Sequence, residues 1–306
     1  MKTHSFIIDE FKLIIEDKVK LPIKWLISHY KKFFNKNPII HFPLHQLIEL
    51  FLNYKTIVDF EQRYNLTETG CCILHSGFVT ELELFEINID KIQDIDGLEF
   101  LIKLDGLDLS GNNITKIEGI NSLKKLRYLK FGNLHYNIGN NITEIDGLKD
   151  LIELKSLDLS LNPIKEIKNL DNLVNIETLI LVNTSITEIK GLDNLHNLDW
   201  LLLESNKISE IKGLDNLKNL RQLDLAENQI KNIKGLKNLK NLTELSLAYN
   251  HITTLENIEH LINLRTLSIQ NNQISKIFLS EKLNALVSVN GEGNIIPERE
   301  LIVALL

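Results

Sequence analysis

The chain is poor in cysteine and has no long apolar run. Only Cys71 and Cys72 occur among 306 residues, and they are adjacent, so no disulfide framework can cap this protein as in many extracellular repeat proteins. No window of the sequence approaches the apolar length of a membrane span. The first residues, MKTHSFIIDEFKLIIEDK, are interrupted by charges and lack the apolar core of a secretion signal. These absences predict a cytoplasmic protein.

Positive charge is also in short supply. The chain has 34 Lys and Arg against 41 Asp and Glu, a net charge of −7. Residues 1–80 hold ten basic and eight acidic side chains, so the acidic excess lies entirely in the remainder. A surface of this sign repels phosphates, which predicts that nucleic acid is not a partner. A membrane surface is not the expected partner either, because the basic second helix is expected to pack against the other front-end helices.

No catalytic constellation is visible. His41 and His45 flank the loop HFPLH, but two histidines are fewer ligands than a metal site usually needs. Cys71 and Cys72 have no neighbouring basic residue to activate a thiolate. The glycines of GEGN at 291–294 lack the lysine and the strand–helix setting of a phosphate loop. The sequence therefore predicts a non-enzymatic protein without a metal site or cofactor.

Leucine, isoleucine and asparagine are abundant, and they recur with a period of 22 residues, as in the stretch 198–219. Such a period predicts a solenoid of stacked units. We count nine complete units from Leu82 and a partial tenth, over residues 82–296. A six-residue insertion around GNLHYNIG lengthens the third unit. Thr184 and Asp90 stand in two units where the others carry an asparagine. These marker asparagines are Asn112, Asn140, Asn162, Asn206, Asn228, Asn250, Asn272 and Asn294.

The residues of one unit explain its spacing. In LRQLDLAEN (220–228), leucines alternate with polar residues, which predicts a short strand with one face inward. Asn228 follows the strand, where its amide can bond the backbone groups left open at a bend. Leu236, Leu239 and Leu242 then recur every three residues, which favours a 3₁₀-like or extended return over an α-helix.

The repeated phrase IxxIxGLxxLxxLxxLxLxxNxI resembles the SDS22-like class of leucine-rich repeats, and bacterial internalin arrays are similar. Members of that class include phosphatase-regulatory, splicing and dynein-associated proteins. The resemblance covers about two thirds of the chain. It implies an α/β fold, a curved solenoid with a parallel β-sheet on the concave face, which serves to bind proteins.

The two ends of the chain differ from the repeats. Apolar stripes predict helices over residues 5–19, from Pro22 to about residue 34, and from Pro43 to about residue 64. Residues 1–70 would then form a helical N-terminal cap. A β-hairpin over 71–81, with Cys71 at the sheet edge, would lead into the array. Residues 297–306 would form a C-terminal capping helix.

Functional residues are expected at the outward positions of the strands. Ile180, Val182, Trp200 and Leu202 lie on neighbouring units, so we expect one apolar patch on the concave face. A large aromatic beside aliphatic residues and ringed by charge has the composition of an interaction hot spot. The charged residues predicted around it are Asp158, Glu204 and Asp224. Secondary contact candidates are Tyr128, Lys130 and Tyr249.

Other interpretations of the patch stay open at this level. The six-residue insertion or a front-end helix could cover it, a homodimer could bury it, or it could be a chance loss of polarity. The leading prediction is a protein-binding scaffold or regulator. A regulatory subunit of an enzyme such as a protein phosphatase is an alternative. So is a peripheral membrane adaptor that uses the basic second helix, with Lys24, Lys31 and Lys32.

Overall fold

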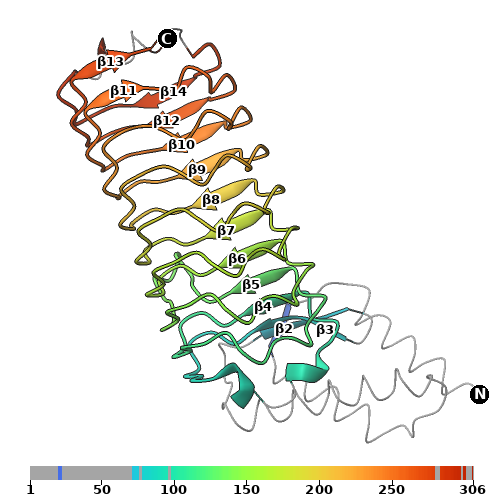
Figure 1. Ribbon diagram of the computed structural model, residues 1–306. Helices are drawn as coiled ribbons and strands as arrows, with labels where there is room; N and C mark the ends of the chain where they lie inside the picture. Colours follow the sequence, from blue (N-terminus) through green and yellow to red (C-terminus); the bar gives the residue numbers. More distant parts are fainter. Residues whose placement is uncertain are drawn as a thin grey trace, which may run out of the picture.

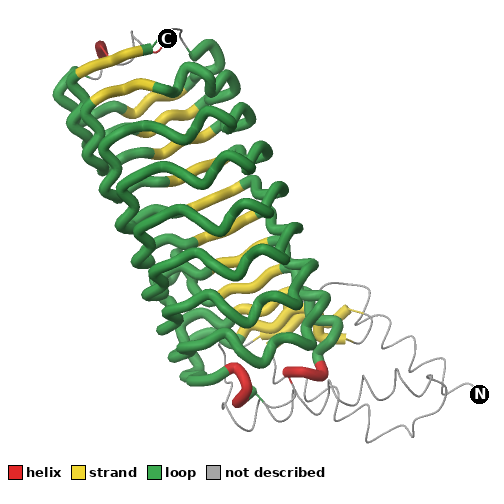
Figure 2. Tube along the Cα trace, in the orientation of Figure 1, coloured by secondary structure: helices red, strands yellow, loops and turns green. Residues whose placement is uncertain are grey.

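The protein folds as a solenoid whose strands form one continuous sheet along one side (Figures 1 and 2). The computed structural model describes residues 20–22, 71–75, 78–95, 98–279, 283–297, 299–300 and 305. Within these residues the main sheet has twelve strands, and their order in the sheet follows the sequence. Each turn of the chain therefore stacks on the turn before it, and the predicted parallel solenoid is confirmed.

Ten of these strands are parallel, and most are three residues long because the chain bends out of the sheet after one inward leucine. The parallel strands are β3 (Phe78–Glu83), β4 (Gly106–Asp108), β5 (Tyr128–Lys130), β6 (Ser156–Asp158), β7 (Thr178–Ile180), β8 (Trp200–Leu202), β9 (Gln222–Asp224), β10 (Glu244–Ser246), β12 (Thr266–Ser268) and β14 (Ser288–Asn290). Two antiparallel strands, β1 (Lys20–Pro22) and β2 (Cys71–His75), precede them in the sheet.

The first turn differs from the sequence prediction. Strand β3 pairs with β2 and also begins the parallel array, where Leu82 aligns with Leu107. The first step is thus 25 residues instead of 22, and Ile87, not Asp90, stands where later turns carry asparagine. Leu82 of β3 fits more than one position of the repeat, and the pairing of β3 with β4 decides between them.

The sheet edge is also one strand further out than expected. Strand β1 lies outside β2, and Pro22 is the last residue of β1, not the first turn of a helix. Proline suits such an edge because it has no N–H to donate to a further strand. The helices predicted over 5–19, 22–34 and 43–64 otherwise lie outside the described residues. At the other end, Arg299, Glu300 and Leu305 are helical, and the Leu305 side chain is buried.

The core is a column of leucine and isoleucine that runs through every described turn. In one turn Leu223, Leu225, Ile230 and Ile233 are all fully buried. Asn228 closes the bend beside them: its Nδ2 donates to Leu203 O (2.9 Å) in the preceding turn, and its Oδ1 accepts from Ile208 N (2.9 Å). Repetition of these bonds gives the predicted asparagine ladder, which satisfies buried backbone groups that leucine could not.

The return segments are mostly irregular. Leu217 N donates to Leu214 O (3.0 Å) and Leu220 N to Leu217 O (3.1 Å), the i to i+3 pattern that leucines three apart predict. Two short 3₁₀ helices, η1 (Ile92–Asp94) and η2 (Leu98–Phe100), occur in the described early turns. A second, parallel sheet of β11 (Thr254–Glu256) and β13 (Lys276–Phe278) was not predicted.

The six-residue insertion forms a small hairpin after β5. Asn133 and Ile138 exchange backbone hydrogen bonds of 2.8 and 3.1 Å. The hairpin leaves and rejoins the array at Gly132 and Gly139, where a Cβ atom would lie about 2 Å from backbone oxygens of the next turn. The Tyr136 ring stacks on Phe85 of the first turn, with centroids 6.2 Å apart. The hairpin therefore leans towards the start of the array, away from β7 and β8.

Candidate functional site

The outward side of the main sheet, here called the sheet face, carries the predicted patch. Strand register places Ile180 beside Leu202 and Thr178 beside Trp200. The Trp200 side chain is 46% exposed, and Ile180 and Leu202 are half-buried. We call Ile180, Trp200 and Leu202 the Trp200 patch. Because Tyr136 of the insertion stacks on Phe85, the insertion does not cover this patch.

Val182 contributes little to the patch, since only 6% of it is exposed. Strand β7 ends at Ile180, so the alternation of inward and outward residues stops there. Asn183 follows with a φ of 51° as the chain turns inward. Val182 thus belongs to the turn, and its neighbours cover it.

Three carboxylates lie next to the patch: Glu204, Asp224 and Glu227, here called the acidic cluster. Burial raises the pKa of Glu204, and the nearby charges of Asp224 and Glu227 raise it further. Burial also raises the pKa of Asp224, although hydrogen bonds from Ala226 and Ser246 oppose the shift. Glu227 accepts a hydrogen bond from Ser205 Oγ (2.7 Å). Among the described residues none of the three forms an ion pair, so their negative charges are uncompensated.

The other predicted contact residues occupy different environments. Asp158 is only 7% exposed, and its Oδ1 accepts bonds from the backbone N (2.9 Å) and hydroxyl (2.6 Å) of Ser160. Burial raises the pKa of Asp158 despite these bonds. Tyr128 and Lys130 are exposed on β5, and the Arg127 guanidinium lies 5.6 Å from the Tyr128 ring centroid. Tyr249 is exposed but lies in the turn after β10, beyond the strands.

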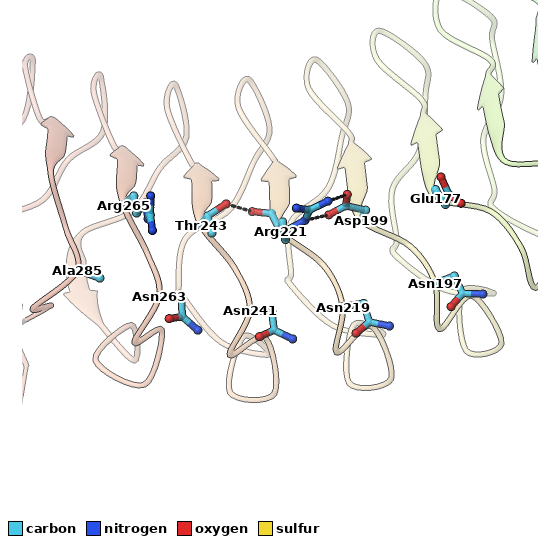
Figure 3. A pocket seen from close by; sticks show the side chains of 10 residues that line it. All are labelled: Glu177, Asn197, Asp199, Asn219, Arg221, Asn241, Thr243, Asn263, Arg265 and Ala285. Carbon is cyan, nitrogen blue, oxygen red and sulfur yellow. Dashed lines mark hydrogen bonds and ion pairs between the residues drawn. The ribbon is translucent and has the colours of Figure 1, made fainter.

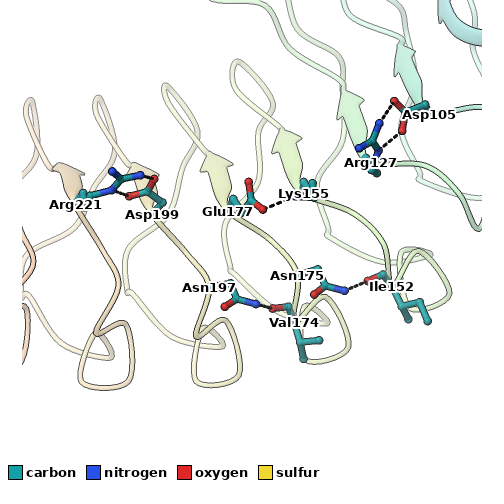
Figure 4. A network of polar contacts seen from close by, with 10 residues as sticks. All are labelled: Asp105, Arg127, Ile152, Lys155, Val174, Asn175, Glu177, Asn197, Asp199 and Arg221. Atoms are coloured by element: carbon teal, nitrogen blue, oxygen red, sulfur yellow. Dashed lines mark hydrogen bonds and ion pairs between the residues drawn. The ribbon is translucent and has the colours of Figure 1, made fainter.

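Sequence reasoning missed a row of charges at the residue that precedes each strand. Asp105 pairs with Arg127, Lys155 with Glu177, and Asp199 with Arg221, each on neighbouring turns (Figure 4). The Lys155 Nζ to Glu177 Oε1 distance is 2.6 Å, and the hydrogen bond to Asp199 raises the pKa of Arg221. The 22- and 28-residue spacings of these charges were visible in the sequence, but pairing them required knowledge of the stacking.

A second asparagine ladder runs beside that row. Each of its members donates Nδ2 to a carbonyl of the preceding turn, as Asn197 does to Val174 O (3.0 Å; Figure 4). The members are Asn175, Asn197, Asn219, Asn241 and Asn263. The ladder and the charged row line a groove of about 590 Å³ from Glu177 to Ala285, here called the strand-start groove (Figure 3).

The described residues hold no cluster of three or more His, Cys, Asp or Glu side chains that could bind a metal ion. Within the same residues, no helix has the length and apolarity required to cross a membrane.

Comparison with known proteins agrees with this architecture. Leucine-rich repeats, as a two-copy family, match residues 196–238 and 240–284. None of the curated proteins matches the chain. The solved LRR protein LIC12759 of Leptospira interrogans is 27% identical, with a TM-score of 0.64, over 74% of this chain and 58% of that one.

Two further structures share the fold. The TLR13 chain in the TLR13–ssRNA13 complex is 26% identical, with a TM-score of 0.63, over 70% of this chain and 33% of that one. The functional domain of InlJ from Listeria monocytogenes is 23% identical, with a TM-score of 0.50, over 70% of this chain and 54% of that one. This chain thus spans a third to three fifths of these proteins. The fold and the matched repeats define a leucine-rich-repeat solenoid.

Proposed function

We propose that this protein is a non-enzymatic interaction scaffold that binds a partner protein through its sheet face. The observation that carries the proposal is an exposed tryptophan, Trp200, beside an acidic cluster with no compensating cation among the described residues. Tryptophan is one of the residue types enriched among interaction hot spots. The partner segment would place an apolar side chain on the Trp200 patch and a Lys or Arg on the acidic cluster.

Charge distinguishes a protein partner from nucleic acid. The TLR13 structure is a complex with ssRNA13, so a solenoid of this kind is compatible with RNA. Here, however, the chain has a net charge of −7 and carries Glu204, Asp224 and Glu227 next to the only exposed tryptophan of the described residues. Carboxylates repel phosphates and attract cationic side chains. This favours a basic protein segment over a polyanion.

The finer parts of the proposal rest on the sequence. The repeat phrase supports placing the array in the SDS22-like class, and the shortage of cysteine and of apolar runs supports a cytoplasmic location.

The test is an affinity capture from an extract of the source cells, with the retained proteins identified by mass spectrometry. Wild type is compared with the double variant Trp200→Glu, Leu202→Glu. The matched control is Ile152→Glu, Val174→Glu, which places two charges at apolar residues that are 55% and 46% exposed but lie on loops away from the sheet face (Figure 4). Circular dichroism checks that each variant is folded.

A protein retained by wild type and by the control, but lost by the Trp200 double variant, is the expected result. For that protein Trp200→Ala should weaken binding by about 2 kcal/mol or more, the usual scale of a buried aromatic anchor. Equal retention by all three chains would show that the Trp200 patch is not the binding site.

A further inference from the structure

Arg265 departs from the pairing rule of the charged row. In that row, Arg127 and Arg221 each bind an aspartate 22 residues earlier, Asp105 and Asp199. The equivalent position for Arg265 is Thr243, whose hydroxyl donates instead to Arg221 O (3.0 Å; Figure 3). Arg265 is exposed and has no ion pair within the described part of the chain. It is therefore an available guanidinium in a row where its two counterparts are neutralised.

Arg265 also lies in the strand-start groove, beside the second asparagine ladder (Figure 3). Asn241 Nδ2 donates to Lys218 O (2.9 Å), and Asn263 Nδ2 donates to Lys240 O (2.8 Å). An amide nitrogen carries two hydrogens and the amide oxygen accepts, so each exposed asparagine keeps one donor and one acceptor for a ligand. The groove thus offers polar groups suited to a peptide backbone, with a cation near one end.

The spacing of the ladder fits an extended chain. Neighbouring strands lie about 4.8 Å apart, so two steps along the ladder, from one asparagine to the second one after it, span about 9.6 Å. Three residues of an extended peptide span about 9.9 Å at roughly 3.3 Å per residue. A peptide that runs along the groove can therefore bring every third residue next to every second asparagine.

We propose that the strand-start groove binds an extended segment of a partner protein that carries an Asp or Glu side chain, and that this carboxylate pairs with Arg265. A guanidinium binds a carboxylate in a bidentate manner, which fixes both position and orientation. None of the residues of the Trp200 patch lines this groove, and the charge preference is opposite, so the two proposals are tested independently.

The decisive variant is Thr243→Asp. It places a carboxylate 22 residues before Arg265, in the same relation as Asp199 to Arg221. Arg265 should then form an ion pair with this carboxylate and no longer be available to a ligand. Thr243→Asn introduces a side chain of the same size without charge and serves as its control. Arg265→Ala removes the cation directly, and Lys240→Ala removes an exposed cation outside the groove lining as the matched charge control.

The probe is a microarray of nine-residue peptides, acetylated and amidated so that side chains supply the only carboxylates. The labelled full-length protein is applied to it, and selected peptides are resynthesised in Asp and Asn versions for fluorescence polarisation. A second set has a free C-terminal carboxylate and no acidic side chain.

We expect wild type to select peptides with an acidic residue. Their affinity should fall about tenfold or more for the Asn peptide, for Arg265→Ala and for Thr243→Asp. It should stay within about twofold for Thr243→Asn and Lys240→Ala.

Several outcomes would overturn the proposal. One is the absence of any acidic peptide among those selected, and another is selection from the free C-terminal set alone. Unchanged binding by Thr243→Asp would show that the carboxylate does not use Arg265. An equal loss in Lys240→Ala would show that the attraction is a general effect of charge and not a site.

Discussion

At the scale of single residues, Thr184 is the weak rung of the buried asparagine ladder. Its hydroxyl lies 2.5 Å from Asn206 Oδ1 and 3.3 Å from Leu181 O. In a regular turn, the ladder asparagine accepts from a backbone N–H of the preceding turn, as Asn206 does from Ile186 N (2.9 Å). Thr184 is too short to do so, and Ile164 N donates instead to Asn162 O (2.7 Å).

Substituting Thr184→Asn should therefore stabilise the protein. The new amide can accept from Ile164 N and donate to carbonyls of two turns, which satisfies buried groups at a net gain on the order of 1 kcal/mol. Urea denaturation followed by circular dichroism gives the free energy of unfolding. Thr184→Ala, which removes the hydroxyl without adding an amide, should lower it. A decrease for Thr184→Asn as well would show that the turn cannot accept the longer side chain.

Predictions for single residues were correct where the strand alone sets the environment and wrong where the following turn does. Trp200 and Leu202 lie on the sheet face because strand alternation alone places them there. Val182 and Asp158 share the expected outward positions, yet both are nearly buried. Val182 lies two residues beyond the end of β7, so the turn decides its burial. Asp158 is an outward residue within β6, but its carboxylate is bound by Ser160 of the turn that follows.

At the scale of elements, the 22-residue period predicted the parallel strands and the returns because every turn repeats the same local pattern. The first turn was misaligned because Leu82 fits both the first apolar position of the repeat, like Leu104, and the central position of the strand, like Leu107; only the pairing of Leu82 with Leu107 selects one. The second sheet of β11 and β13 was missed because it depends on two neighbouring returns becoming extended together.

The protein should still fold when the insertion hairpin is deleted. Deleting residues 133–138 leaves Phe131-Gly132-Gly139-Asn140, which has the same spacing as Leu225 to Asn228 in a regular turn. We expect the variant to fold, with a cost of about 1 kcal/mol from the lost stacking of Tyr136 on Phe85. Thermal unfolding monitored by circular dichroism measures this cost.

Deletion of residues 225–230 is the control, since it removes the same number of residues from a regular turn, including three fully or largely buried apolar side chains, Leu225, Ala226 and Ile230. It should unfold the array. If the hairpin deletion unfolds the protein to the same extent, then Tyr136 and its neighbours stabilise the first turn far more than one ring contact would.

At the scale of the whole molecule, unpaired charges of opposite sign lie at opposite ends of the described strands. The acidic cluster lies where β8 and β9 lead into their turns, and Arg265 lies where β12 begins. The sequence predicted an acidic array from composition alone, but not this separation, because strand direction determines which side of the stack each charge occupies.

The acidic cluster should make binding at the Trp200 patch depend on pH. Burial raises the pKa of Glu204 and of Asp224, so in the free protein both carboxylates take up protons at a higher pH than ordinary carboxylates do. A cationic partner binds only the charged forms well. Its affinity should therefore be greatest above these raised pKa values and fall as the pH drops through them.

The partner captured by the wild-type chain in the extract provides the measurement. Its dissociation constant, determined by surface plasmon resonance from pH 8 down into the acid range, should rise as the pH falls through the raised pKa values of Glu204 and Asp224. Glu204→Gln cannot titrate at that position, so it should bind more weakly at pH 8 and show a shallower dependence. Glu210→Gln, at an exposed carboxylate outside the strands that pairs with Lys212, is the control and should follow wild type. A dissociation constant independent of pH would mean that the partner uses the apolar patch alone and that the acidic cluster contributes nothing to recognition.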